Sequence, residues 1–253
     1  METIIDQPLA MFFFSLVLTI AASEIGVQLV TRLRLNVGDL VQFGIIQTAT
    51  LTLVALVIGF TFAMAVSRYD QRKNLEAEEA NAIGTAYLRA GLLPEADAAK
   101  VRARLKDYLG QRIGWYSRTE HRDLDAIDAV TARTQEELWE AVRVPVAAQQ
   151  TAVTALVAAS MNDAINSQGY TQAAWWNRIP TAGWMLMLVL AFCANVLLGM
   201  GAKAREQHGL VFVLPVVLAL AFLLIADIDG PRGGLIDVGP RNLVSLARSL
   251  GVP

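Results

Sequence analysis

The chain has 253 residues, of which 55% are hydrophobic, and its mean hydropathy is +0.43, yet it carries 21 Lys and Arg and 23 Asp and Glu. This combination is typical of an integral membrane protein with a sizeable water-exposed part. The formal net charge of -2 argues against a nucleic-acid partner, because no basic stripe is available to neutralise phosphates.

Four stretches of the sequence are apolar enough to cross a bilayer, whose hydrocarbon core of about 30 Å requires roughly 20 apolar residues in a helix. We expect these spans at about 9–30, 41–66, 179–200 and 210–226. The N-terminus lacks the basic region of a cleavable signal peptide, so we expect the first span to be retained. Cys193 is the single cysteine and falls in an apolar run, which favours a packed thiol.

A carboxylate, Glu24, falls toward the end of the first span. An intramembrane charge is costly and usually faces protein or water. Glu24 therefore has a functional role inside the membrane, or it lies at the interface close to Arg32 and Arg34.

The second span continues into the charged helical sequence 71–79 without a Gly or Pro at the boundary. A helix that leaves the bilayer in this way can form the wall of a pore that opens into a soluble vestibule. Thr48, Thr52, Leu56 and Phe60 recur every four residues and share one face of this helix. Rings of Leu and Phe would form an apolar constriction that excludes water. The alternative is that the stripe packs against neighbouring helices.

Residues 69–178 are too polar for a membrane, and their apolar positions recur at helical spacing. Within them, Pro145 is expected to kink or break a long helical run, and Gly169 is a plausible C-terminal stop. The sequence has no strand signal, so we predict an all-α membrane protein with four spans and a large helical domain between the second and third. The expected parts are 1–68, 69–178, 179–228 and a tail with a short helix at 229–253.

Residues that carry catalytic or cofactor chemistry are missing. The two histidines, His121 and His208, belong to no Glu-x-x-His pair, and there is no Cys-x-x-Cys, phosphate-binding glycine loop or nucleophile elbow. We therefore expect no enzyme activity, no metal and no cofactor. Glu76 and Glu79 form a carboxylate pair with two interpretations. They lie on the solvated side of the helix and pair with neighbouring cations, or they face a vestibule and attract ions.

The run from Gly59-Phe60 to Ser67-Arg68, followed by Tyr69-Asp70-Gln-Arg72-Lys73, resembles the second transmembrane helix of bestrophins. The segment 227–233 is similar to the acidic-Pro-x-Gly segment after the last bestrophin span. The segments 78–89 and 229–236 resemble the bacterial bestrophin-like family, and this likeness covers nearly the whole chain.

Bestrophins are homopentameric anion channels, with chloride as the ion expected, and some bacterial members pass cations. The resemblance maps their three-residue neck onto Thr52, Leu56 and Phe60, and the polar Thr52 makes the neck shorter or wetter at one end. It places Arg68 at the inner end of the constriction, where it reaches headgroups or pairs with an acidic group such as Asp229. Asp227 and Asp229 match an ion-binding turn in part, or they form an acidic exit from the membrane.

The leading hypothesis is an oligomeric, pentameric channel for small monovalent ions, whose partners are copies of itself, the lipid bilayer and those ions. The alternative is a non-conducting scaffold or sensor whose soluble domain binds a protein. We expect a multi-pass protein of the bacterial inner membrane, with the domain and both termini in the cytoplasm. The positive charges at 31–34 and 203–205 weakly favour the opposite orientation under the positive-inside rule. The sequence therefore does not determine the orientation in the membrane.

Overall fold

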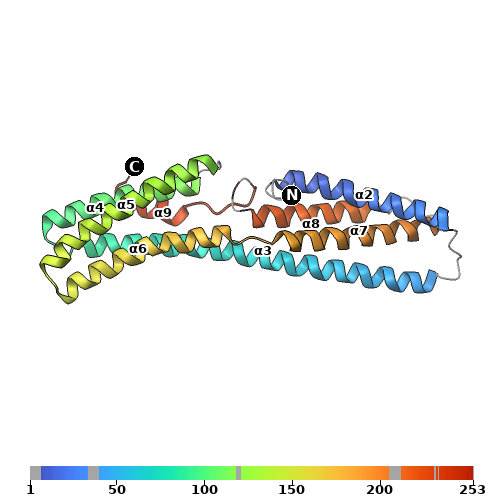
Figure 1. The fold of residues 1–253 in the computed structure, drawn as a ribbon, viewed down its shortest axis with the longest axis horizontal. Helices are drawn as coiled ribbons and strands as arrows, with labels where there is room; N and C mark the ends of the chain where they lie inside the picture. The colour runs from blue at the N-terminus through green and yellow to red at the C-terminus, as the bar shows by residue number, and fades with distance from the viewer. Residues whose placement is uncertain are drawn as a thin grey trace. The chain divides into compact units, whose positions relative to one another are not determined.

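The computed structural model describes residues 7–33, 40–117, 121–204, 212–230, 232 and 234–252, without the side chains of 33, 40, 41, 121–125, 203 and 204. Within this part of the chain the predicted all-α class is confirmed (Figure 1). The helices are α2 (Pro8–Leu33), α3 (Leu40–Ala90), α4 (Glu95–Ser117), α5 (His121–Ala148), α6 (Ala152–Trp176), α7 (Thr181–Ala204), α8 (Val213–Asp229) and α9 (Arg241–Ser249).

Three stretches of the described chain are long and apolar enough to cross a membrane: Pro8–Arg32, Gln42–Ala90 and Ala152–Ala202. They contain the first three spans expected from the sequence. The fourth expected span corresponds to α8, which has 17 residues and is the most apolar of the helices. That length is slightly below the roughly 20 residues that a full crossing requires.

The chain divides into two compact units, each described here by itself. The first unit contains Met1–Tyr69 and Arg178–Asp237, and the second contains Asp70–Asn177 and Val238–Pro253. Helix α3 contributes to both, because it continues without a break across the position where the units meet in the sequence.

Small residues bring α2 and α7 close together in the first unit. A Cβ added to Gly26 would lie 2.1 Å from the carbonyl oxygen of Val196, and one added to Gly199 would lie 2.0 Å from that of Ser23. The hydroxyl of Ser23 lies 3.4 Å from the Oδ1 of Asn195 at the same crossing. Close backbone approach of this kind is how helices associate in a bilayer. Cys193 is exposed, so the expectation of a packed thiol is wrong.

The second unit is built from α4, α5, α6, α9 and the C-terminal part of α3, with α4 packed on α5 and α9. Pro145 lies inside α5, which ends three residues later at Ala148. The expected stop at Gly169 is wrong, since α6 continues through it to Trp176. An interior glycine costs a helix only about 1 kcal/mol, and the buried residues that flank Gly169, such as Ser167 and Thr171, hold α6 in place.

Candidate functional site

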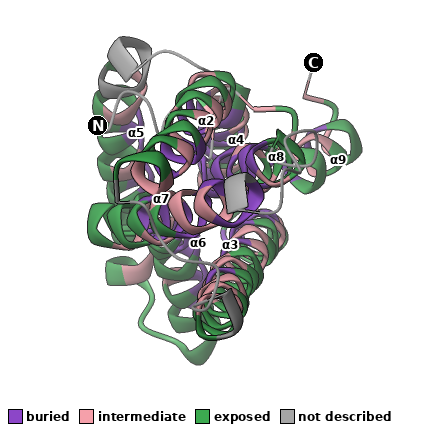
Figure 2. Ribbon diagram, turned by 90° about the vertical axis from the view of Figure 1, so that its right-hand side faces the viewer, coloured by how far each residue is buried: buried purple, intermediate pink, exposed green. Residues whose placement is uncertain are grey.

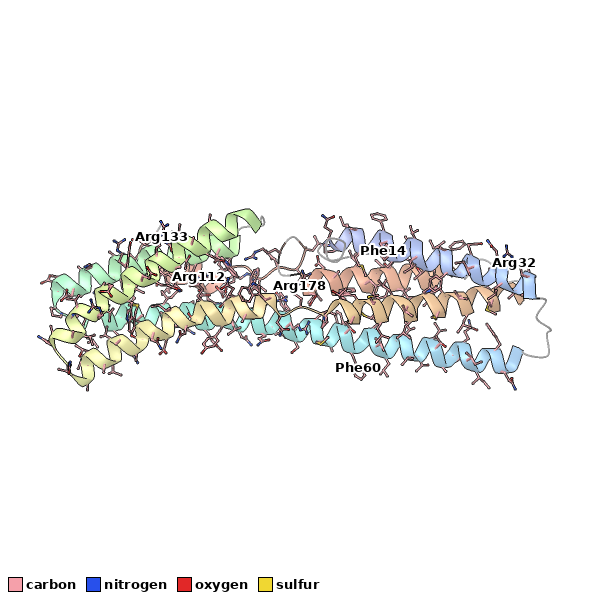
Figure 3. The ribbon with its side chains drawn as sticks, viewed as in Figure 1. Phe14, Arg32, Phe60, Arg112, Arg133 and Arg178 are labelled. Carbon is pink, nitrogen blue, oxygen red and sulfur yellow. The ribbon has the colours of Figure 1, made fainter. Side chains whose placement is uncertain are left out.

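One face of α3 has no partner among the described residues. Thr48 and Thr52 are exposed, and the residues Leu56 and Phe60 are 51% and 68% exposed. Val54, on the other side of the helix, is only 3% exposed. Figure 2 marks exposed residues of α3 in green, and Figure 3 shows Phe60 projecting away from the other helices. The four residues predicted to line a pore are therefore all left exposed by the part of the chain that the structure describes.

This lack of cover distinguishes α3 from the other apolar helices. In its most apolar window only 11% of residues are buried, against 33% for Pro8–Arg32 and 39% for Ala152–Ala202. An extended apolar surface of this kind is typical of a helix that contacts lipid or another protein chain.

Arg68 and Asp229 form an ion pair at the end of α8. Arg68 Nη1 lies 3.5 Å from Asp229 Oδ1, and the Asp229 side chain is fully buried. Both carboxylate oxygens also accept the backbone N–H of Ile179 at 3.1 Å, and Arg178 Nε lies 3.8 Å from Oδ2. Of the two positions expected for Arg68, the pairing with Asp229 is the one observed.

Asp227 holds the segment that follows α8. Its carboxylate accepts the backbone N–H groups of Leu235 at 2.7 Å and Ile236 at 3.0 Å. A Cβ on Gly234 would lie 2.2 Å from Asp227 Oδ1, so a side chain at this position would displace the carboxylate from these contacts. Both carboxylates of the predicted turn thus bind donors of their own chain, which favours the interpretation as an acidic exit from the membrane. No group of three metal-ligating side chains is present among the described residues.

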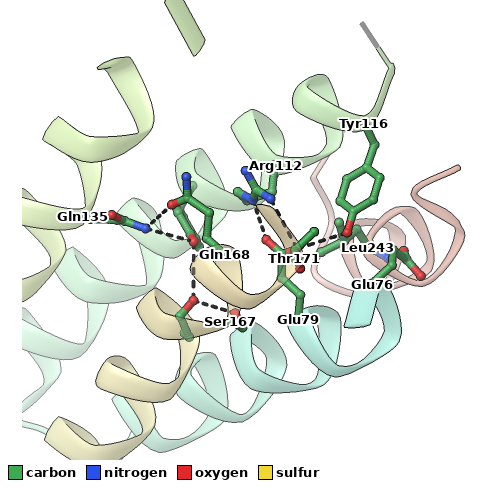
Figure 4. Close-up of polar contacts among 11 residues, drawn as sticks. Glu76, Glu79, Arg112, Tyr116, Gln135, Ser167, Gln168, Thr171 and Leu243 are labelled. Atoms are coloured by element: carbon green, nitrogen blue, oxygen red, sulfur yellow. Dashed lines mark hydrogen bonds and ion pairs between the residues drawn. The ribbon is translucent and has the colours of Figure 1, made fainter. Parts of the chain in front are cut away.

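Glu79 is buried in the second unit, where it pairs with Arg112 of α4 through the Nε of the guanidinium (Figure 4). Its Oε2 also accepts hydrogen bonds from the Tyr116 hydroxyl at 3.3 Å and the Thr171 hydroxyl at 3.1 Å. The expectation that Glu79 faces solvent or a vestibule is therefore wrong. The partners of Glu79 come from α4 and α6. The spacing of charged residues along α3 could not identify them, because they lie far away in the sequence.

The same environment shifts the pKa values of the groups around Glu79. Burial would lower the pKa of Arg112, but the charge of Glu79 and its hydrogen bond raise it overall. Burial raises the pKa of Tyr108 to about 12, with a further contribution from Glu79. The pKa of Tyr116 is also raised, first by burial and then by Glu79. Arg112 therefore stays charged and the two phenols stay neutral at physiological pH.

Glu76 is buried as well, and it binds the beginning of α9. Its Oε1 accepts the backbone N–H groups of Asn242 at 2.8 Å and Leu243 at 2.9 Å. A carboxylate at a helix N-terminus satisfies free N–H groups and complements the helix dipole. The expectation that Glu76 is solvated or faces a vestibule is wrong for the same reason as for Glu79, since a segment distant in the sequence covers it.

Two other predicted sites are less informative. Arg72, one of the neighbouring cations of Glu76 and Glu79, is buried and donates to the carbonyl oxygens of Ala174 and Asn177, both at 3.1 Å. Glu24 is exposed on α2, as is Arg32, while Arg34 lies outside the described residues. A functional role for Glu24 stays a prediction.

Comparison with known proteins identifies a family. The family model described as the bestrophin-like domain matches residues 13–243. A bacterial bestrophin homologue from Klebsiella pneumoniae has 17% sequence identity and a TM-score of 0.65, and the match covers 94% of this chain and 96% of that one. A single-substitution variant of that homologue has 17% identity, coverage of 96% of both chains and a TM-score of 0.67. At this identity the likeness shows a shared fold. No curated protein matches the sequence.

Proposed function

Because the chain belongs to the bestrophin-like family, we propose that it forms a homo-oligomeric, pentameric ion channel for small monovalent ions. Members of the bestrophin fold family are ion channels. In this proposal the copies surround a central axis, and α3 of each copy lines the pore.

The observation that carries the proposal is the exposed apolar face of α3. Leu56 and Phe60 lie one turn apart and are exposed, although both are large and apolar. A monomer in lipid would leave them facing acyl chains, and the small polar residues Thr48 and Thr52 on the same face would gain nothing there. Around an aqueous axis the Thr hydroxyls contact water, and the Leu and Phe rings form a narrow barrier to it.

The neck in this proposal consists of Thr52, Leu56 and Phe60. Leu56 and Phe60 do not bind ions, so they act as a barrier, and Thr52 lets water enter from one end. The Thr52 hydroxyl donates to the carbonyl oxygen of Thr48 at 2.8 Å, which leaves its lone pairs available to ions or water.

The organisation predicted from the sequence is part of the proposal. Helices α2, α3, α7 and α8 would be the four spans, with residues 69–178 as a soluble domain. The fourth span is short, but Asp227 and Asp229 at its end are neutralised by N–H groups and cations of the chain, so burial of this end near the membrane is tolerated. The expected location is the bacterial inner membrane, with the domain and both termini in the cytoplasm.

A non-conducting scaffold is the alternative, and the exposed apolar side chains of the second unit favour it. Leu88 at 71% exposure and Trp176 at 73% could contact another protein. Oligomeric state and current separate the two functions. Purified protein should have the mass of a pentamer in detergent, and it should pass current in a planar bilayer. A monomer or dimer without current supports the scaffold.

A further inference from the structure

The face of α3 (Leu40–Ala90) that carries Leu56 and Phe60 can be followed further along the same helix. An α-helix has 3.6 residues per turn, so positions 18 residues apart are separated by five full turns and share a face. Eighteen residues after Leu56 and Phe60 come Asn74 and Glu78. The proposed pore face therefore changes along the helix from apolar to polar and acidic.

The side chains on this later part of the face are exposed. Asp70 takes the position five turns after Thr52, and both Asp70 and Glu78 are exposed. Among the described residues, neither of them forms an ion pair, and neither carboxylate accepts a hydrogen bond. Glu76 and Glu79 differ on both counts, since they are buried and bonded within the second unit. Of the acidic residues at positions 76–79, only Glu78 is free to contact an ion.

The cations near Glu78 in the sequence do not neutralise this face. Arg68 and Arg72 are bonded to Asp229 and to backbone carbonyls. Lys73 is exposed, and at 100° per residue it lies about 140° around the helix from Glu78 but only about 60° from Asp70. Lys73 therefore offsets the charge of Asp70 and leaves that of Glu78. The exposed residues on the face between positions 67 and 85 are Ser67, Asp70, Gln71, Asn74, Glu78, Asn81 and Thr85. Apart from Lys73 at its margin next to Asp70, this face carries only negative fixed charge, and Glu78 is the carboxylate farthest from that lysine.

We propose that Glu78 faces the conduction path and makes the channel favour monovalent cations over anions. This inference rests on the proposed function. Rings of carboxylates concentrate cations and repel anions in a pore. Glu78 thereby takes the role that the sequence alone would assign to Glu76 and Glu79. The apolar ring at Leu56 and Phe60 controls whether the pore is wet, and Glu78 controls which ions enter.

The test is the reversal potential of the full-length protein in a planar bilayer under a potassium chloride gradient. Glu78→Gln keeps the shape of the side chain and removes its charge. We expect this substitution to lower the ratio of potassium to chloride permeability by roughly threefold. The reason is that several carboxylates at about 10 Å from an ion, with a screening length of about 8 Å, change the local concentration of the ion by roughly that factor. The difference should shrink as the salt concentration rises.

Glu136→Gln is the matched control. Glu136 is an exposed carboxylate on α5 that likewise has no bonded partner among the described residues. The Glu136→Gln substitution should leave the reversal potential unchanged. Equal reversal potentials for Glu78→Gln, Glu136→Gln and the unchanged protein would overturn the assignment of Glu78. Absence of current from the unchanged protein would instead remove the proposed channel function itself, and this inference with it.

A second measurement decides the question even if Glu78→Gln assembles poorly. Glu78→Cys is combined with Cys193→Ser, because Cys193 is exposed and is the one native thiol. In the assembled channel, a negatively charged methanethiosulfonate should restore the cation preference and a positively charged one should reverse it. Identical selectivity after both reagents, with labelling verified by mass, would overturn the proposal.

Discussion

The guanidinium of Arg112 on α4 and the carboxylate of Glu79 on α3 form an ion pair in which neither side chain is exposed. The pair is completed by the hydroxyls of Tyr116 and Thr171. Arg112 also lies over the Trp115 ring, with its Cζ 4.7 Å from the ring centroid. The polar centre of the second unit thus connects α3, α4 and α6.

Glu79→Ala should therefore destabilise the second unit strongly. It leaves the Arg112 charge buried without its carboxylate, which costs about 3–5 kcal/mol. Chemical denaturation monitored by Trp fluorescence measures the change in unfolding free energy. The double variant Glu79→Leu, Arg112→Met should be more stable than Glu79→Ala, since no unpaired charge remains. A Glu79→Ala variant as stable as the unchanged protein would show that the pair is not buried in solution.

Tyr108 and Tyr116 should titrate above the ordinary range of a tyrosine, because the pKa of each is raised. Burial raises the pKa of Tyr108 to about 12, and the pKa of Tyr116 is raised for the same reason. The folded state therefore keeps protons that the unfolded state loses above the ordinary pKa of about 10. The unfolding free energy should be unaffected by these groups below pH 10 and should fall as pH rises from 10 to 12. Tyr108→Phe should reduce this fall. Tyrosinate absorbance that rises in one step near pH 10 for all tyrosines would contradict the prediction.

Gly26→Ala should disrupt the crossing of α2 and α7. The new methyl group would lie 2.1 Å from the carbonyl oxygen of Val196, so one helix must shift, at a cost of about 1–3 kcal/mol. The thermal unfolding temperature in detergent measures the loss. Gly169→Ala is the control, because no atom lies within 4 Å of the added Cβ, and it should be neutral or stabilising. Equal effects of both substitutions would argue against close packing at Gly26.

Glu76→Ala should release α9 from α3. The carboxylate binds two N–H groups at the start of that helix, and loss of such a cap costs about 0.5–2 kcal/mol. Limited proteolysis should cut near Asn242 faster in this variant, while Glu78→Ala, which removes an exposed carboxylate two residues away, should not change the rate. Unchanged proteolysis of Glu76→Ala would show that other contacts hold α9.

The helices of this chain could be predicted from hydropathy and helical periodicity, but the environments of its charges could not. The continuity of α3 follows from the absence of a Gly or Pro near Arg68, and the structure shows it as one helix. The burial of Glu76 depends on α9, which is far away in the sequence, and that of Glu79 depends on Arg112 and Thr171. The spacing of residues within α3 does not predict partners that lie this far away in the sequence.

One local signal was available for the acidic residues. Glu78 is in register with Phe60, whereas Glu76 and Glu79 are in register with the buried side of α3 that contains Val54 and Ala65. A helical projection that continued past the membrane boundary would have separated the exposed carboxylate from the buried ones. The pairing of Arg68 with Asp229 was predictable because both residues end apolar runs.

The central claim is that the exposed face of α3 lines an ion pathway, and the conductance of Leu56→Ala, Phe60→Ala tests it most directly. The double variant should give a larger current from an oligomer of unchanged mass, because it widens the apolar ring and lowers the barrier to water. Val54→Ala, on the buried side of α3, should reduce stability without raising the current. If the double variant instead loses about 2–5 kcal/mol per site, as packed residues do, and its oligomer dissociates without current, the face is a packing surface and the account is contradicted.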